Sequence, residues 1–353
     1  MMQNFVYDQL PCRVVFGAGS FGTLAAEVDR LGLSRLLVLS TPGQSRLAED
    51  AGRHLGSRAI SLYPHAKMHV PIETAEAARA EARRLGVDGT VAIGGGSTIG
   101  LAKAIALESG LPIVAVPTTY AGSEMTPIYG LTEGGAKRTG RDPKVLPRTV
   151  IYDPILTLGL PAKVSGPSGM NAIAHCVEAL YAENANPVIS LMAEEGIRAL
   201  ARGLPRIAVD PGDRDARGDA LYGAWLAGIS LGAVGMALHH KLCHTLGGSF
   251  NLPHAETHTI VLPHAVAYNS GAAPEAMARI ARALSAAEAA SGLYDLAASI
   301  GAPLALEEIG LQEQDLDKAA EIATRNPYYN PRPISREGIR RLLEDAFHGR
   351  RPS

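Results

Sequence analysis

The sequence predicts an α/β fold class for its N-terminal part, as a doubly wound parallel sheet, followed by an all-α C-terminal part. Two observations lead to this prediction. Short apolar runs alternate with helical patterns through the first 155 residues, which is typical of a parallel sheet covered by helices on both faces. After Pro154, strand signals almost vanish and helical periodicity takes over. A chain of 353 residues is long for one core, so we expect two domains, 1–155 and 156–353.

Apolar runs predict the strands of the sheet at 35–40, 59–64, 89–96 and 112–119. Helical spacing at 47–55 follows the first run, and Pro71 begins a second helix that closes at Gly86, the usual order of proline first and glycine last. A third helix is expected at 97–110, and right-handed crossovers make such a sheet doubly wound. Residues 126–152 differ, because a Gly-Gly turn between alternating segments predicts an antiparallel excursion that ends at TVIYDP.

The second half is predicted to be helical throughout. Its expected helices lie at 166–182, 187–204, 216–246, 256–269, 274–285, 292–300, 315–324 and 335–347. The boundary near 153–162 is a shift in composition that includes Pro154 and Pro161.

Composition excludes several classes of partner. The formal net charge of −2 gives no reason to expect nucleic acid or an anionic membrane, and no apolar stretch is long enough to span a bilayer. The N-terminus has no basic start before an apolar run, so no secretory signal is expected. Cys12, Cys176 and Cys243 lie far apart, which suits a reducing compartment and argues against disulfides or a cysteine-based zinc site. We therefore expect a cytoplasmic protein.

A glycine turn stands where the third strand enters a helix, and it consists of Gly94, Gly95, Gly96, Ser97 and Thr98. Glycine lets the backbone approach a ligand closely, and the helix start offers unpaired N–H groups and a partial positive charge. This arrangement suits a dinucleotide pyrophosphate. A tight turn without a ligand explains the glycines equally well, since the motif is neither GxGxxG nor a P-loop.

Hydroxyl side chains follow the next strand. Thr118 and Thr119 end that strand at the same edge of the sheet, and Ser123 and Thr126 lie in the loop after it. Open α/β sheets bind ligands at the carboxyl ends of their strands, so these residues are candidates for cofactor contacts. The alternative, that the hydroxyls only cap a turn, has similar weight.

Histidines gather in the second half. Asn171 and His175 are four residues apart on one predicted helix, and so are His240 and His244 on another. Residues at that spacing share a helix face. His254 follows after a short loop. A lone histidine is usually structural, but this grouping favours a functional site, with His258 and His264 left as core or supporting residues.

Four phrases occur in order along the chain: GGGSTIGLAKA, VPTTYAGSEMTPI, SGMNAIAHCVEAL and HHKLCHTLGGSFNLPHAETHTIVLPH. Together they resemble the iron-containing alcohol dehydrogenase superfamily over essentially the whole chain. The phrases NFVYDQLPCRVVFGAGS and GLTEGGAKRTGRDPKVLPRTVIYDP resemble its maleylacetate reductase branch in particular. The resemblance implies a homodimer with a Rossmann-like domain, a helical domain and an active site in the cleft between them, an architecture shared with 3-dehydroquinate synthase.

The resemblance also shows departures. Members of the superfamily hold a divalent metal with one Asp and three His, and the corresponding residues here are Asn171, His175, His240 and His254. A neutral amide is a poor replacement for a carboxylate on such a cation, so we expect that no metal is required. Gly100 stands where many relatives carry Asp, which leaves part of that loop's contacts in doubt.

The branch implies reduction of the carbon–carbon double bond of maleylacetate, a dicarboxylate, to 3-oxoadipate with NADH. In this hypothesis His240 and His254 stabilise the developing negative charge, and His244 donates a proton. His175 and Asn171 orient the substrate. Lys241 is adjacent in sequence but points about 100° away from His240 on a helix, and it is a further catalytic candidate without an assigned role.

Two residues concern the cofactor. By its place in the superfamily pattern, Lys137 is expected to contact the ribose or phosphate. Thr41 stands where relatives often place an acidic residue against the ribose, and a neutral side chain there lets NADPH be accepted beside NADH. Other cations that can recognise substrate carboxylates are Arg138, Arg141 and Arg325, although a solvated surface is the simpler explanation for each.

Three other functions compete with this reading. One is a metal-dependent alcohol or polyol dehydrogenase of the same superfamily, which would lose activity on chelation. The second is an NAD-using lyase resembling 3-dehydroquinate synthase, with no net change in nicotinamide absorbance. The third is a nucleotide-binding protein without catalysis, which the clustered histidines disfavour.

Overall fold

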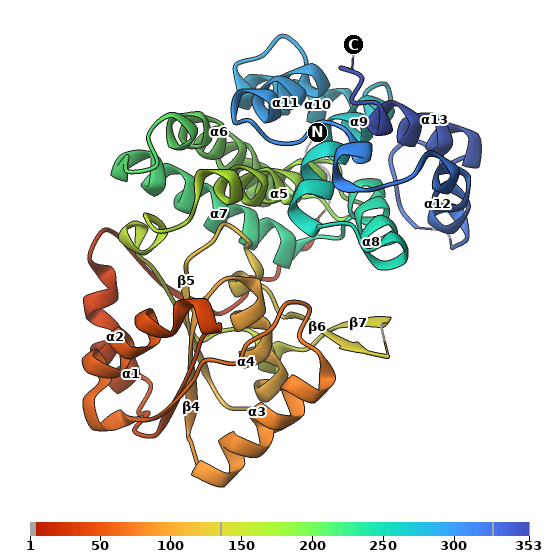
Figure 1. Ribbon diagram of the computed structural model, residues 1–353. Coiled ribbons are helices and arrows are strands. Elements are labelled where there is room, and N and C mark those ends of the chain that lie inside the picture. Colours follow the sequence, from red (N-terminus) through yellow and green to blue (C-terminus); the bar gives the residue numbers. More distant parts are fainter. Residues whose placement is uncertain (1–4, 135, 327, 353) are drawn as a thin grey trace. The chain divides into compact units, whose positions relative to one another are not determined.

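The computed structural model describes residues 5–134, 136–326 and 328–352, and it divides the chain into two compact units (Figure 1). One unit is Gln9–Leu160, and we call it the sheet unit. The other begins at Pro161 and also takes in the N-terminal segment up to Asp8, and we call it the helical unit. Each unit is described by itself below.

The sheet unit contains a six-stranded sheet in the order β1-β8-β5-β4-β2-β3, and neighbouring strands pair in parallel. Its strands are β1 (Arg13–Phe16), β2 (Leu36–Leu39), β3 (Ala59–Tyr63), β4 (Gly89–Gly94), β5 (Ile113–Pro117) and β8 (Thr149–Tyr152). The predicted parallel sheet is confirmed. Strand β1 was not predicted, because its apolar run is only three residues long, Val14 to Phe16.

Helices cover both faces of this sheet, and they are α1 (Leu24–Arg30), α2 (Ser45–Leu55), α3 (Ile72–Leu85) and α4 (Gly96–Ser109). Alternate residues of β2 enter different cores. Leu36 and Val38 pack in the core with α1 and α2, whereas Leu37 and Leu39 pack in the core with α3 and α4. The doubly wound arrangement is therefore confirmed. Gly86 ends α3 with φ of 58°, which a glycine adopts without strain.

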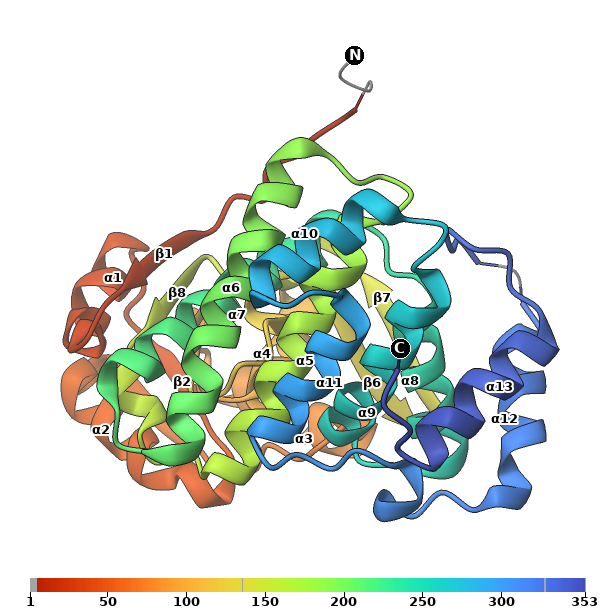
Figure 2. The same cartoon turned by 90° about the horizontal axis from the view of Figure 1, so that it is seen from above.

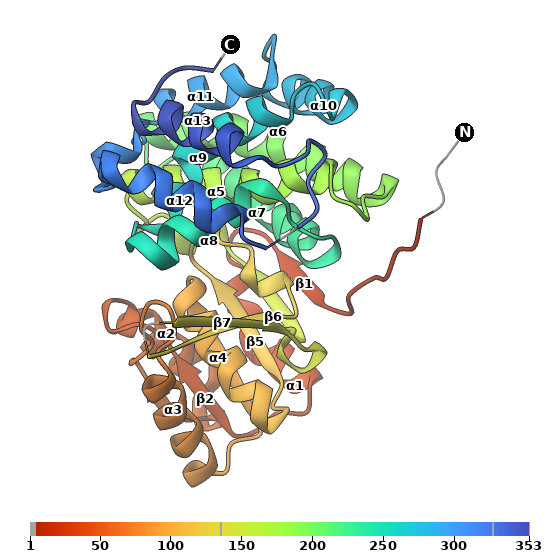
Figure 3. The same ribbon diagram turned by 90° about the vertical axis from the view of Figure 1, so that its right-hand side faces the viewer.

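The expected antiparallel excursion is a hairpin of β6 (Ile128–Glu133) and β7 (Ala136–Arg141), and Figure 3 shows its two strands side by side. The excursion ends earlier than expected. Thr149–Tyr152 pairs in parallel with β1 and β5, so it belongs to the main sheet rather than to the hairpin.

The helical unit has nine α-helices within the described residues (Figure 2). They are α5 (Ala162–Leu180), α6 (Pro187–Val209), α7 (Arg214–Ala233), α8 (Leu238–Phe250), α9 (His254–Asn269), α10 (Pro274–Leu284), α11 (Ala289–Ser299), α12 (Leu316–Thr324) and α13 (Arg336–Phe347). Helix α5 is buried from Ser165 to Leu180, which makes it the central helix of this unit.

The prediction of one helix over 216–246 is wrong. The chain forms α7 and α8 instead, bent by 95° at a short break. The break is held by hydrogen bonds from the backbone to side chains of another segment: Gly235 N–H donates to Asn184 Oδ1, and Ala237 N–H donates to Glu178 Oε2. Among the described residues, only this bent pair has the length and apolar composition of a membrane span, and no single helix does.

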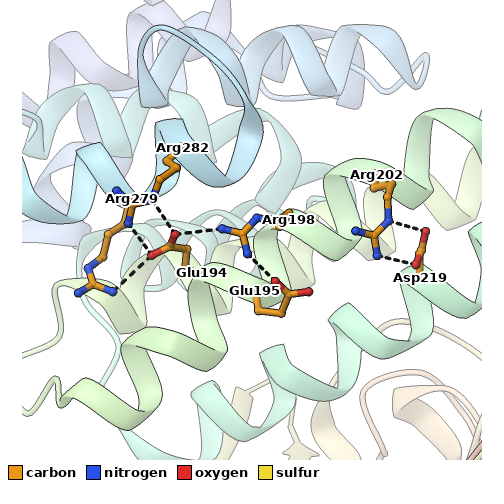
Figure 4. Close-up of polar contacts among 7 residues, drawn as sticks. All are labelled: Glu194, Glu195, Arg198, Arg202, Asp219, Arg279 and Arg282. Carbon is orange, nitrogen blue, oxygen red and sulfur yellow. Dashed lines mark hydrogen bonds and ion pairs between the residues drawn. The ribbon is translucent and has the colours of Figure 1, made fainter.

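An ion-pair network joins α6 to α10 (Figure 4). Glu194 on α6 accepts hydrogen bonds from Arg198 of the same helix and from Arg279 and Arg282 of α10. The side chain of Glu194 is only 11% exposed, so its charge depends on these three guanidinium groups.

Candidate functional site

The turn from β4 to α4 requires glycine. Gly94 has φ of 148°, and a Cβ atom built on it would lie 2.5 Å from Thr98 Oγ1. A Cβ on Gly95 would lie 2.9 Å from the side chain of Thr119. Helix α4 begins at Gly96, and its N-cap residue, Gly95, has no side chain to accept hydrogen bonds from the first turn. The helix start can therefore offer its N–H groups to an anion, as predicted for a pyrophosphate.

Further polar groups lie around this turn. Thr118 N–H donates to Gly94 O, which ties the ends of β4 and β5 together. Gln44 Nε2 donates to Thr118 Oγ1 at 2.7 Å, and Thr41 Oγ1 lies 3.4 Å from Gln44 Oε1. Thr98 Oγ1 is buried with no hydrogen-bond partner among the described residues. The structure thus brings Thr41 to the glycine turn through Gln44, which sequence reasoning missed.

The loop after β5 is held by a buried lysine that was also missed. Lys103 Nζ donates to the carbonyl oxygens of Ser123, Thr126 and Ile128 and to Thr126 Oγ1, at 2.7–3.0 Å. Burial lowers the pKa of Lys103 to about 7, against a smaller opposing effect of the Glu124 carboxylate. Thr126 is almost fully buried, and its hydroxyl is used inside the loop.

Two other predictions concern this unit. Lys137 lies in β7, but its side chain is outside the described residues. Ser97 is half-buried in the first turn of α4. Gly100, the departure from the family's Asp, faces Val70, and a Cβ on it would lie 2.7 Å from Val70 Cγ2. The Val70 side chain therefore occupies the direction that the longer residue would take.

The helical unit brings most of the predicted polar groups together. Asn171 and His175 lie on α5, His240 and His244 on α8, and His254 is the first residue of α9. The rings of His175 and His240 are stacked with centroids 5.1 Å apart, and those of His240 and His244 are 6.1 Å apart. Asn171, His175 and His240 are buried, whereas His244 and His254 are exposed. We call these five residues the histidine cluster.

Several ligating atoms of the histidine cluster are buried without a partner among the described residues. They are Asn171 Oδ1, His175 Nδ1 and His240 Nε2. Burial, reinforced by the neighbouring imidazoles, holds the pKa of His175 well below its usual value, so this ring is neutral at neutral pH. Buried polar atoms are normally hydrogen-bonded, and unpaired ones need a functional explanation. The cluster has the character of a binding site for a polar molecule.

Glu178 orients the His240 ring of the cluster through a hydrogen bond to Nδ1, and sequence reasoning missed this residue. Its side chain is fully buried on α5 and accepts hydrogen bonds from Ala237 N–H, His239 N–H and His240 Nδ1 at 2.7–2.9 Å. The first two bonds cap α8, and the third fixes the His240 tautomer so that Nε2 is the atom left unpaired. Glu178 stands in an apolar phrase, CVEAL, which gave no sign of a carboxylate with this task.

A second histidine pair lies beside the cluster. His239 Nε2 and His258 Nδ1 are hydrogen-bonded at 2.9 Å, and both side chains are fully buried. The ring of His258 lies 5.0 Å from that of His240 and 4.3 Å from that of His254. His258, left as a supporting or core residue by the sequence, thus contacts two members of the cluster.

The donor set at the family's metal position lacks the carboxylate that a divalent cation favours. In the part of the chain that the structure describes, a metal-sized group of His, Cys, Asp or Glu donors occurs only at His239, Cys243 and His258, and not at His175, His240 and His254. The nitrogen donors of that group already bond each other, and burial raises the pKa of the Cys243 thiol well above its usual value. The position of the family's carboxylate ligand is the amide of Asn171.

The candidate cations are placed as follows. Lys241 is half-buried beside the cluster, with Nζ 5.8 Å from the ring centroid of Tyr328. Arg138 pairs with Glu133 at 3.2 Å in the hairpin, and Arg325 pairs with Glu321 at 3.0 Å. These two arginine side chains are largely exposed, as the simpler surface explanation expects.

Comparison with known proteins agrees with this geometry. A family model described as iron-containing alcohol dehydrogenase matches residues 11–154, and one described as Fe-containing alcohol dehydrogenase family, C-terminal, matches residues 166–347. The chain is 61% identical to a maleylacetate reductase of Burkholderia cepacia, with 100% of each chain covered. It is 60% identical to one of Sphingobium indicum, with 99% of each covered. A crystal structure of maleylacetate reductase from Agrobacterium tumefaciens superposes with a TM-score of 0.97 at 54% identity, covering 99% of this chain and 100% of that one.

Proposed function

The chain belongs to the iron-containing alcohol dehydrogenase family, and from this premise we propose that it reduces the carbon–carbon double bond of maleylacetate to give 3-oxoadipate. It is an NAD(P)H-dependent oxidoreductase of the maleylacetate reductase type. The observation that supports the proposed chemistry best is the histidine cluster, in which buried imidazole and amide atoms stand unpaired where relatives have a carboxylate and a metal.

The sheet unit supports nicotinamide dinucleotide binding. The tight glycine turn at Gly94 and Gly95, the open space beside Gly96 at the uncapped start of α4 and the unpaired Thr98 hydroxyl fit a pyrophosphate and its neighbouring ribose. Thr41 carries no charge, so NADPH can be accepted beside NADH. When bound, the nicotinamide supplies a hydride to the substrate.

The chemistry asks the protein to stabilise an enolate. Hydride addition at the carbon β to the ketone moves an electron pair onto the ketone oxygen, and a proton must then reach the α carbon. We assign stabilisation of the enolate oxygen to His254 and to His240, because preorganised donors lower the energy of such a charge. Since His240 Nδ1 bonds Glu178, its Nε2 donates to the enolate only when the ring carries a second proton, as imidazolium. Glu178 holds the His240 ring in place through its hydrogen bond to His240 Nδ1. The exposed His244 is the proton donor.

The remaining members of the cluster position the substrate. His175 is neutral, so it serves as a hydrogen-bonding partner rather than as a source of charge. The amide of Asn171 can accept and donate hydrogen bonds on the same face. Lys241, next to the cluster, offers a cation for a substrate carboxylate. Because the residues present do not fit a divalent metal, we propose that none is required.

A direct assay tests the function. Chelator-treated protein is mixed with NADH and maleylacetate, and absorbance at the nicotinamide band is followed. The expected result is loss of NADH matched by formation of 3-oxoadipate, with no gain on adding iron or zinc. Activity that disappears on chelation and returns with metal would instead support a metal-dependent dehydrogenase. NADH binding without turnover would overturn the assignment.

Two further properties are proposed. We expect a cytoplasmic protein, since Cys12, Cys176 and Cys243 are all free thiols, as a reducing compartment favours. We also expect a homodimer, as in the family that the sequence resembles. Analytical ultracentrifugation at micromolar concentration measures the second property directly, and a single monomeric species would contradict it.

A further inference from the structure

A cavity of about 480 Å³ lies in the helical unit, away from the residues of the histidine cluster. Its walls come from the last turns of α9, from α13 and from the segment after α13. His264, Ala267 and Tyr268 of α9 line it, and the first of them lies ten positions after His254. At about 1.5 Å of rise per residue, the two histidines are roughly 15 Å apart along the helix. The cavity is therefore separate from the proposed active site.

The cavity concentrates positive charge in an acidic protein. Arg332, Arg341, Arg350 and Arg351 line it against a single carboxylate, that of Asp345, although the whole chain has a formal net charge of −2. Asp295 and Glu337, which pair with two of these arginines from outside the cavity, still leave an excess of one positive charge. Clustered guanidinium groups are typical of sites for carboxylate and phosphate.

Three of the arginines are held in place by the protein. The Arg332 guanidinium stacks on the Tyr268 ring at 4.2 Å and donates to Tyr268 O at 3.0 Å. Arg350 donates to Asp345 at 2.8 Å, and Arg351 makes two bonds of 2.7 Å to Asp295. Their positions are therefore largely organised before any ligand arrives, which lowers the entropic cost of binding.

The fourth arginine is loosely paired. Arg341 lies 3.8 Å from Glu337, and both side chains are at least 70% exposed, so this pair is weak. Arg341 is free to turn toward a ligand. A second polar group is unsatisfied at the cavity: His264 is only 4% exposed, and its Nε2 is buried without a hydrogen-bond partner among the described residues.

We propose that this cavity is a binding site for a small, doubly charged oxyanion, recognised by the guanidinium groups of Arg332 and Arg341. Its volume is in the range of ordinary small-molecule pockets. Arg332 bonds a backbone carbonyl and Arg341 is only loosely paired, so these two guanidinium groups suit two negatively charged groups rather than one. Dicarboxylates and inorganic phosphate share this chemistry.

Calorimetric titration of the full chain with succinate and, separately, with inorganic phosphate tests the proposal at fixed low ionic strength. We expect one saturable site per chain outside the histidine cluster, so binding persists in His240→Ala. Arg341→Gln should weaken it about tenfold, the loss of one charge-assisted contact. Arg332→Gln should weaken it at least as much. The anion that binds more tightly, succinate or phosphate, identifies the class of ligand as carboxylate or phosphate.

Arg336→Gln is the matched control, because Arg336 lies on the same helix, is 61% exposed and does not line the cavity. It should bind as the unchanged protein does. The proposal is overturned if neither anion binds, if Arg336→Gln weakens binding as much as Arg341→Gln, or if His240→Ala abolishes it. Equal melting temperatures of the Arg341→Gln and Arg336→Gln variants exclude misfolding as the cause of a difference.

Discussion

Among single residues, Glu178 joins the fold most directly to the chemistry. One buried carboxylate caps α8 through two backbone N–H groups and fixes the ring of His240. Glu178→Gln keeps the shape of the side chain but replaces one carboxylate oxygen by an NH₂ group. Both oxygens accept hydrogen bonds, so the NH₂ group would face another donor and one bond would be lost. We expect kcat to fall about ten- to hundredfold, as for other partners of catalytic histidines. The KM for NADH should stay unchanged, because the residues proposed to bind the nucleotide lie in the sheet unit.

Steady-state kinetics with varied NADH measure both constants. Glu183→Gln is the control, since Glu183 is exposed just after α5 and should leave kcat unaltered. A Glu178→Gln variant whose kcat matches that of the control would show that the hydrogen bond to His240 has no positioning role.

Gly96 gives a residue-scale prediction for the cofactor. Nothing lies within 4 Å of a Cβ atom built on it, so Gly96→Ala should fold with an unchanged melting temperature. The open space is the place proposed for the pyrophosphate, so we expect the KM for NADH to rise severalfold. Gly159→Ala, which also points into open space but lies outside the site, is the control. Equal KM values for the two variants would place the pyrophosphate elsewhere.

The predictable part of the site has a simple physical origin. Asn171 with His175, and His240 with His244, could be grouped because a four-residue spacing fixes their relative direction on a helix. Glu178, Gln44 and Lys103 could not be found, because their partners are backbone or side-chain atoms of distant segments. Local spacing carries no information about such contacts.

At the level of elements, the sequence identified most helices and strands but misjudged the break between α7 and α8. Helical periodicity continues across 216–246, and the glycines there are tolerated in a helix. The break exists because Glu178 and Asn184 accept the hydrogen bonds of the chain at 235–239. A tertiary contact thus overrides a local preference, and it points His240 toward α5.

The α6–α10 network leads to a prediction about stability. The pKa of the Glu194 carboxyl lies below its ordinary value, and the largest cause is the hydrogen bond that Glu194 accepts from Arg282. Because the native state lowers this pKa, the stabilisation is present above about pH 4.5, the ordinary value, and is lost as the pH falls through the native value. Glu194→Gln should therefore destabilise the helical unit by about 1 kcal/mol at pH 7, a modest figure because the arginines are partly exposed.

Thermal unfolding at pH 7 and in acid measures this difference. We expect the difference in melting temperature between the variant and the unchanged protein to disappear in acid, because the carboxyl of Glu194 is then itself protonated. Glu195→Gln removes a carboxylate that pairs with Arg198, and it should lower the melting temperature at pH 7 less than Glu194→Gln does. A gap that persists in acid would mean that the Glu194 charge is not responsible.

On the scale of the whole molecule, the order of apolar runs was enough to predict a parallel sheet followed by helices, because both patterns are periodic along the chain. The order of the strands was not predictable. Strand β8 is separated from β5 by the hairpin and still pairs with it, and β1 joins the edge of the sheet next to β8. Such placements follow from long-range packing, which no local pattern records.

The division into two units implies that cofactor binding and proton chemistry can be lost separately. The glycine turn lies in Gln9–Leu160, and the histidine cluster lies beyond Pro161. The double variant His240→Ala/His244→Ala should therefore bind NADH with a Kd within about twofold of the unchanged protein, since the residues proposed to bind the nucleotide and the two histidines belong to different compact units. Its turnover of maleylacetate should fall by about a thousandfold or more, because both the proposed enolate donor and the proposed proton donor are gone. Fluorescence titration of NADH measures the Kd, and single-turnover absorbance measures the hydride transfer. Near-normal turnover with tight NADH binding would remove the histidines from the mechanism, whereas loss of NADH binding would show that the two units do not act separately.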